Sequence, residues 1–187
     1  MRHWRHWAAP MALLVLAFAF RGPLEADPVT HVLVQLPMLA LAGALLPLRA
    51  GLGAWNRGGW AALLVAIFAT AFWMLPRAID GALTDPGLEA AKFVTLPLAV
   101  GLMLRIGRAR AHPLLRGFLK AQALAMLGVL AFLYTHAPAR LCNAYLIEDQ
   151  ARLGHGFLVV ALGLAVIWIL PLFFGQRNTR ARRARVA

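Results

Sequence analysis

Three of the histidines and two of the methionines are the residues of this chain whose types and positions suggest chemistry. His31, His136 and His155 each lie within about one helical turn of the end of an apolar segment. Met74 ends a further apolar segment, and Met38 lies deeper in the same segment as His31. Imidazole and thioether ligands suit copper, above all Cu(I), better than magnesium or calcium. These five residues are therefore the predicted ligands of a copper or other cofactor site.

The spacing of His31, Gln35 and Met38 adds to this prediction. These residues follow the pattern i, i+4, i+7 and share one face of a helix. An unpaired imidazole or amide in hydrocarbon costs several kcal/mol, so we expect this face to look into a helix bundle. Gln35 is thus placed to support a bound metal rather than to face lipid.

Further polar residues could attract or orient a cation near these histidines. Glu148, Asp149 and Cys142 lie together between two apolar segments, and Asp80 follows the segment that ends at Met74. Asp149 has an ordinary alternative role, because an acid just before a helix is a common N-cap. The single cysteine excludes an internal disulfide and a site made of cysteines alone.

A simpler interpretation of the histidines and methionines stays open. A histidine near a membrane interface can hydrogen-bond a loop carbonyl or a carboxylate, and methionine in an apolar helix is commonly core filling. In that case the chain is a structural or scaffolding membrane subunit, and its histidines only hold loops in place.

The elements that must position these residues are apolar blocks of membrane-spanning length. The chain of 187 residues is 61% hydrophobic and 14% charged, whereas soluble domains carry about 25% charge. We predict an all-α integral membrane protein, one domain over residues 1–176, followed by a basic cytoplasmic tail without fixed structure at 177–187. The predicted helices are about 7–20, 28–48, 59–75, 89–106, 113–136 and 150–174. Residues 1–26 also fit a cleaved signal peptide, and both alternatives stay open.

The charges predict how these helices cross the membrane. Most Lys and Arg residues lie in the connections on the side of the N-terminus, and all seven acids lie in the others. The positive-inside rule then gives a six-transmembrane-helix bundle with the N and C termini cytoplasmic. The net charge of +12 is explained by these connections and by a tail that touches anionic lipid. We therefore expect the lipid bilayer, and no nucleic acid, as a partner.

Three short stretches carry a resemblance to a known family. They are HVLVQLPM at 31–38, FWMLPRAID at 72–80 and EDQARLGH at 148–155. Together they resemble the CtaG-type cytochrome c oxidase assembly factors, bacterial membrane proteins linked to copper insertion into haem-copper oxidases. Met74 stands where that family is expected to have a histidine, and six helices stand where seven are expected.

The resemblance implies a function that is not enzymatic. It suggests a multi-pass protein of the bacterial inner membrane that holds Cu(I) at the periplasmic face and helps insert it into a cytochrome c oxidase or another cuproenzyme. A haem-copper oxidase subunit or a periplasmic copper chaperone would be its protein partner. The alternative cofactor is haem, with two of His31, His136 and His155 as axial ligands.

Overall fold

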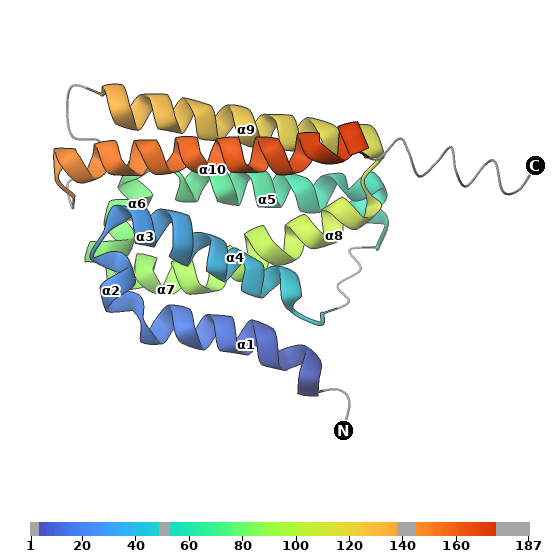
Figure 1. Ribbon diagram of the computed structural model, residues 1–187. Coiled ribbons are helices and arrows are strands. Elements are labelled where there is room, and N and C mark those ends of the chain that lie inside the picture. Colours follow the sequence, from blue (N-terminus) through green and yellow to red (C-terminus); the bar gives the residue numbers. More distant parts are fainter. Residues whose placement is uncertain (1–3, 49–52, 138–144, 175–187) are drawn as a thin grey trace, which may run out of the picture.

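The computed structural model describes residues 4–48, 53–137 and 145–174, and every regular element in these ranges is a helix (Figure 1). The predicted tail at 177–187 and Cys142 lie outside the described residues. The elements η1 and η3 are π-helical segments, and η2 is a 3₁₀ segment. In chain order the elements are α1 Trp4–Ala19, α2 Arg21–Glu25, α3 Pro28–Thr30, η1 His31–Gln35, α4 Leu36–Leu45, η2 Gly53–Gly59, α5 Trp60–Trp73, α6 Pro76–Thr84, α7 Pro86–Thr95, η3 Leu96–Leu102, α8 Met103–Arg110, α9 Pro113–His136 and α10 Ile147–Phe174.

Each of the six predicted apolar blocks is helical, but they differ in length. Among the described residues, four continuous helical runs are long and apolar enough to cross a membrane: Pro28–Leu45, Pro86–Arg110, Pro113–His136 and Glu148–Pro171. A fifth crossing is formed if Gly53–Trp73 and Pro76–Thr84, which are bent by 72°, count as one span. The apolar part of α1 is shorter than a span. The fold is thus all-helical and multi-pass, with four or five candidate membrane-spanning helices.

Proline after a capping residue begins three of the helical runs. The Asp27 side chain accepts a hydrogen bond from Val29 N at 3.0 Å, and Asp85 accepts one from Gly87 N at 2.7 Å. His112 caps α9 in the same way. Proline fits the first helical turn because its missing N–H would have no partner there. The fourth predicted helix therefore begins at Pro86, three residues earlier than the predicted residue 89.

Two helical runs contain a π-helical turn beside an internal proline. The segment η1 precedes Pro37, where the sequence predicts a kink, and η3 contains Pro97. Proline removes one intrahelical hydrogen bond and clashes with the preceding turn, and a widened turn relieves this clash. In η1 the widened turn carries His31 and Gln35.

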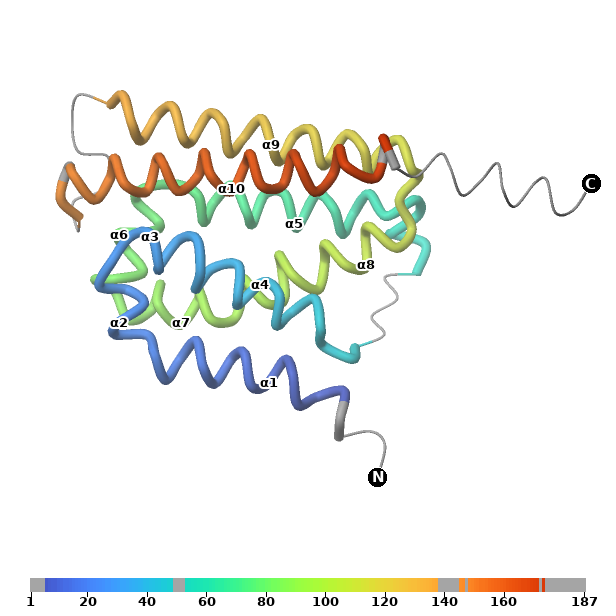
Figure 2. Tube along the Cα trace, in the orientation of Figure 1, coloured from blue at the N-terminus to red at the C-terminus, as the bar shows by residue number. Residues whose placement is uncertain are grey.

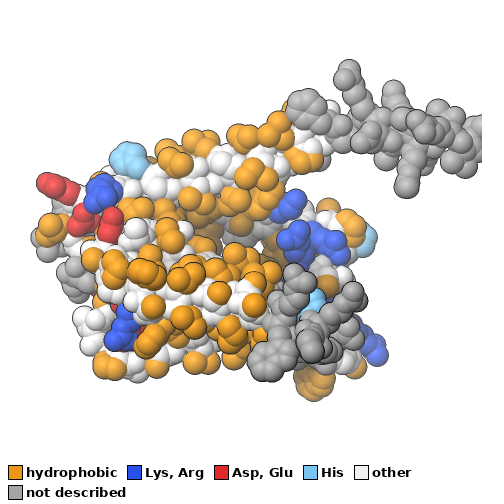
Figure 3. Space-filling view, turned by 60° about the horizontal axis from the view of Figure 1, so that its bottom comes forward, with side chains coloured by type: hydrophobic (Ala, Val, Ile, Leu, Met, Phe, Trp, Pro, Cys, Tyr) orange, Lys and Arg blue, Asp and Glu red, His pale blue; other side chains and the backbone are white. Residues whose placement is uncertain are grey.

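Charged side chains gather at the two ends of the helix bundle. The helices α9 and α10 form an antiparallel pair, α10 contacts α3, and α1 lies beside α4 (Figures 1 and 2). On the face shown in Figure 3, acidic side chains are seen only at the end where α2, α3 and α6 lie. The other end shows Lys and Arg, as the asymmetry of charge in the sequence predicts.

A close backbone contact joins α4 to η3. A Cβ atom added to Gly43 would overlap the carbonyl of Pro97, and one added to Gly101 would overlap the carbonyl of Ala40. Small residues let membrane helices approach this closely and gain dispersion contacts along their backbones. This crossing fixes the run that carries His31 against the run that begins at Pro86.

We predict that Gly43→Ala and Gly101→Ala each lower the free energy of unfolding by about 1–3 kcal/mol, because the added methyl group forces the two backbones apart. Gly117→Ala is the matched control in α9, where a Cβ meets nothing within 4 Å. Alanine there should leave stability unchanged or raise it by up to about 1 kcal/mol. Unfolding curves in detergent measure all three, and equal midpoints would contradict the close crossing.

Candidate functional site

Five polar residues from separate elements meet inside the acidic end of the bundle. They are Glu25 of α2, His31 and Gln35 of η1, Lys92 of α7, and Tyr145, which precedes α10. We call this group the buried polar cluster. His31, Gln35 and Lys92 are fully buried, and Tyr145 is 8% exposed. The prediction that the His31 and Gln35 face looks into the bundle is confirmed.

The ammonium group of Lys92 lies at the centre of this cluster. Its Nζ is 2.6 Å from Glu25 Oε1, 3.1 Å from Gln35 Oε1 and 3.4 Å from His31 Nε2. An ammonium has three hydrogens to donate, and three acceptors surround it here. A buried charge is tolerated when it is paired and fully hydrogen-bonded, and Lys92 meets both conditions.

The hydrogen bonds of Tyr145 determine the tautomer of His31. The Tyr145 hydroxyl donates to the backbone carbonyl of Glu25 at 2.8 Å, so its hydrogen is not available to His31. The contact of 3.1 Å between Tyr145 Oη and His31 Nδ1 is then a bond that Nδ1–H donates. The lone pair of the neutral ring is left on Nε2, the nitrogen that faces Lys92.

Gln35 connects the cluster to the N-terminal helices. Its Nε2 donates to Glu25 Oε1 at 3.0 Å and to the Ala17 carbonyl at 3.3 Å. No buried polar side-chain atom of the cluster lacks a partner. The cluster therefore attaches α1 and α2 to the bundle through hydrogen bonds, whereas most of α1 offers only apolar side chains.

Opposing effects act on the pKa of Glu25. Partial burial raises this pKa, but the hydrogen bonds from Lys92 and Gln35 and the positive charge of Lys92 outweigh the burial and hold it below the ordinary value of 4.5. The carboxyl is therefore ionised at neutral pH and forms a true ion pair with Lys92.

The predicted ligand His31 is thus occupied by other partners. Lys92 sits where a metal bound to His31 Nε2 would sit, so the three acceptors around Nζ hold a tethered cation. The charge pattern does not single out Lys92, because a lysine at the start of the helix predicted at 89–106 is consistent with it. A lysine within an apolar segment of membrane-spanning length is by itself a candidate functional residue, and this pattern could have identified Lys92.

The other two predicted histidines share a separate cavity between α9 and α10. His136 and His155 both line this cavity of about 310 Å³, and both are exposed. His155 Nδ1 lies 2.8 Å from the Ala151 carbonyl, and His136 Nδ1 lies 2.8 Å from the Thr135 hydroxyl and 3.1 Å from the Phe132 carbonyl. The Thr135 hydroxyl donates to the Ala131 carbonyl at 2.7 Å, so it accepts from His136 Nδ1. A ring that donates from Nδ1 to a carbonyl presents Nε2 to a metal, an arrangement typical of metal-binding histidines.

Close packing of α9 on α10 brings these two histidines to one cavity. A Cβ on Gly154 would lie 2.6 Å from Thr135 Cγ2, so the glycine beside His155 lets the helices approach at this level. The His136 ring stacks on Phe132 with ring centroids 4.5 Å apart. Both histidines lie within about one turn of the end of an apolar segment, and the structure places them beside one cavity.

The remaining predicted ligands lie elsewhere. Met38 and Met74 are half-buried and pack against the hydrophobic core, and Asp80 is half-buried in α6. Cys142 belongs to the connection that the structure does not describe. Within the described ranges, no group of three or more His, Cys, Asp or Glu side chains is placed to hold a metal ion.

The two acids at the start of α10 belong to its first turn. The helix begins at Ile147, so Asp149 is not its N-cap, which was the alternative role considered for it. Asp149 accepts a hydrogen bond from Arg152 at 3.2 Å, and Arg152 also pairs with Asp27 at 3.2 Å. Glu148 is exposed. These charges join the start of α10 to the start of α3.

Comparison of the chain with protein-family models, with curated proteins and with solved structures finds no match. The resemblance to the CtaG-type assembly factors therefore stays a prediction that rests on the three short stretches.

We predict that Lys92→Met lowers the free energy of unfolding by about 3–5 kcal/mol, because it leaves the Glu25 carboxylate buried without its cation. The double variant Glu25→Gln with Lys92→Met should recover much of this loss, since it removes both charges. Lys120→Met, at an exposed lysine of α9 whose ammonium lies over the Trp168 ring, is the control and should cost at most about 1 kcal/mol. Unfolding in detergent measures the series, and a double variant no more stable than Lys92→Met would contradict the pairing.

We also predict that acid weakens the cluster through Glu25. Because its pKa is lowered on folding, the carboxylate contributes stability above pH 4.5, and this contribution is lost as the pH falls through the lower folded value. The unfolding midpoint of the wild type should therefore fall below pH 4.5 more steeply than that of Glu25→Gln. If the unfolding midpoints of the two proteins fall equally with pH, protonation of Glu25 is not linked to stability.

Proposed function

We propose that this protein is a copper-binding assembly factor of the bacterial inner membrane. In this proposal it is a six-helix, multi-pass protein with both termini in the cytoplasm, which holds Cu(I) at the periplasmic face and helps insert it into a cytochrome c oxidase or another cuproenzyme. The observation that carries the proposal is the cavity shared by His136 and His155, whose Nδ1 atoms both contact carbonyls of their own helix.

The chemistry of this pair suits transient binding of Cu(I). Cu(I) is stable with few ligands and accepts imidazole nitrogen, and an exposed pair leaves room for an acceptor protein to supply the next ligand. Asp149, in the first turn of the helix that carries His155, and the exposed Glu148 beside it would attract a cation toward the cavity. Cys142, predicted to attract or orient the cation, belongs to the connection between α9 and α10 and lies outside the described residues.

The proposal narrows the predicted ligand set to the α9–α10 cavity. His31 is engaged by Lys92 and Tyr145, and the two methionines contribute to the hydrophobic core. The carriers of copper are then His136 and His155, and the partner would be an oxidase subunit or a periplasmic copper chaperone that reaches this exposed face.

A structural or scaffolding role is the second candidate function. The observation in its favour is the buried polar cluster, in which Lys92, His31 and Gln35 already have their partners within the chain. Such a cluster stabilises a fixed arrangement of helices and needs no ligand. In this case His136 and His155 only hydrogen-bond carbonyls of their own helices.

We predict that the purified protein binds about one Cu(I) and that His136→Ala and His155→Ala each weaken this binding, because each removes one imidazole ligand. The control is His112→Asn, at an exposed position whose capping hydrogen bond to Leu114 N asparagine can replace. Competition with a chromophoric Cu(I) chelator gives the affinities, and an absorption spectrum tests for haem.

Wild-type Cu(I) affinity in both alanine variants would reject the site. Absence of Cu(I) binding by the wild type would instead favour the scaffolding role. A Soret band in the purified protein that is lost in these variants would assign the pair to haem.

A further inference from the structure

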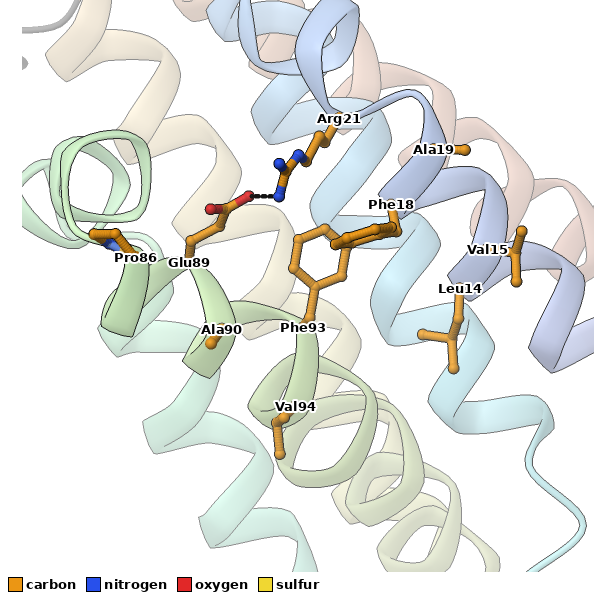
Figure 4. A pocket seen from close by; sticks show the side chains of 10 residues that line it. All are labelled: Leu14, Val15, Phe18, Ala19, Arg21, Pro86, Glu89, Ala90, Phe93 and Val94. Carbon is orange, nitrogen blue, oxygen red and sulfur yellow. Dashed lines mark hydrogen bonds and ion pairs between the residues drawn. The ribbon is translucent and has the colours of Figure 1, made fainter.

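A second cavity, separate from both polar sites, lies between α1 and α7. Figure 4 shows its lining side chains, which come from the C-terminal half of α1, from Arg21 of α2 and from the length of α7. The cavity has a volume of about 610 Å³, within the usual range for small-molecule sites. We call it the α1–α7 groove.

The groove is apolar along its length and charged at one end. Arg21 and Glu89 form an ion pair of 2.9 Å at that end, with side chains 48% and 26% exposed. Phe18 and Phe93 face each other beyond the pair with ring centroids 5.6 Å apart, and Leu14 lies further along (Figure 4). Seven residues separate Leu14 from Arg21, which corresponds to about 10 Å along a helix. The groove thus has the polarity of a site for an amphiphile.

Its place in the bundle matches the headgroup level of a bilayer. Glu89 lies in the first turn of the candidate span Pro86–Arg110, whereas Val94 at the apolar end lies more than a turn deeper. The charged end of the groove is also the acidic end of the molecule, since Arg21 and Glu25 both belong to α2. A bilayer that surrounds these helices therefore places lipid headgroups beside Arg21 and acyl chains beside Phe18 and Phe93.

The ion pair has bonding capacity that the protein does not use on its own. Arg21 donates one hydrogen bond to Glu89, and a guanidinium has five N–H donors. The Glu89 carboxylate likewise has further lone pairs available for a donor. A ligand that presents an anion to Arg21 and a hydrogen-bonding cation to Glu89 would complement both charges.

We propose that the α1–α7 groove binds one ethanolamine phospholipid. Its phosphate pairs with Arg21, its primary ammonium donates to Glu89, and one acyl chain follows the groove over the contacting rings of Phe18 and Phe93. A glycerol headgroup offers Arg21 the same phosphate but gives Glu89 no cation. A choline headgroup gives Glu89 a cation that has no N–H to donate. This proposal is independent of copper binding, which concerns the opposite side of the bundle.

The lipid would also complete the packing of α1. Apolar walls that enclose an empty groove lose dispersion contacts, and an acyl chain restores them. The helix α1 is shorter than a membrane span, and the bound lipid would extend its apolar contact with α7.

Native mass spectrometry of the detergent-purified full chain tests this proposal with phosphatidylethanolamine, phosphatidylglycerol and phosphatidylcholine of identical acyl chains. We expect one tightly held phosphatidylethanolamine, bound about tenfold more tightly than the other two, which is the effect of one charge-assisted hydrogen bond. Equal affinity for the three lipids, or preference for phosphatidylglycerol or phosphatidylcholine, would overturn the proposal.

Variants separate a specific site from ordinary lipid solvation. Glu89→Gln should abolish the preference for phosphatidylethanolamine, and Arg21→Gln should weaken all three lipids. Ala90→Trp fills the groove and should displace the lipid, whereas Ala123→Trp, at an exposed alanine of α9, should not. Retention of the same lipid preference by both charge variants, or of the lipid by Ala90→Trp, would show that the groove is not the site.

Discussion

The arrangement of the acidic end depends on the need to satisfy one buried ammonium group. Lys92 is fully removed from solvent, so a missing acceptor would leave its ammonium group without a partner. Its partners come from α2 and η1, and His31 in turn engages Tyr145 before α10. These hydrogen bonds have directions and fixed lengths, so they specify how four separate elements meet. Apolar packing alone would allow the same helices to slide or rotate with a smaller loss of free energy.

Two kinds of contact thus hold the bundle together at different levels. In the apolar interior, Gly43 and Gly101 let the backbones of α4 and η3 touch, and shape decides the fit. At the acidic end, charge and hydrogen bonding determine how the helices fit together. The two exposed histidines of the α9–α10 cavity belong to neither network. They are free of the hydrogen bonds that hold His31, and for this reason the proposal assigns copper to this pair rather than to the buried histidine.

The sequence predicts the helices well and the lateral arrangement poorly, for a physical reason. Apolar block length and the proline-led helix starts locate each helix, and the rise per residue gives the depth of a side chain. Depth correctly relates His136 to His155, and periodicity correctly buries the His31 face. Neither quantity gives the rotation of one helix about its axis relative to another. The separation of His31 from the other two histidines, and its pairing with Lys92, depend on that rotation. The bond between Lys92 and Glu25 joins residues 67 apart in sequence, so no local pattern encodes it.

The long sequence separations within the cluster have a consequence for biogenesis. Glu25 is synthesised well before Lys92 and before Tyr145, whose hydroxyl bonds the Glu25 carbonyl across 120 residues. During translation the carboxylate of α2 has no cation to pair with, so this segment stays hydrated at the membrane surface while the later helices insert. Docking of the N-terminal segment then completes the assembly. The part of the chain that is made early is therefore fixed late, and a ribosome-bound intermediate that ends before Lys92 lacks the ion pair that attaches α2 to the bundle.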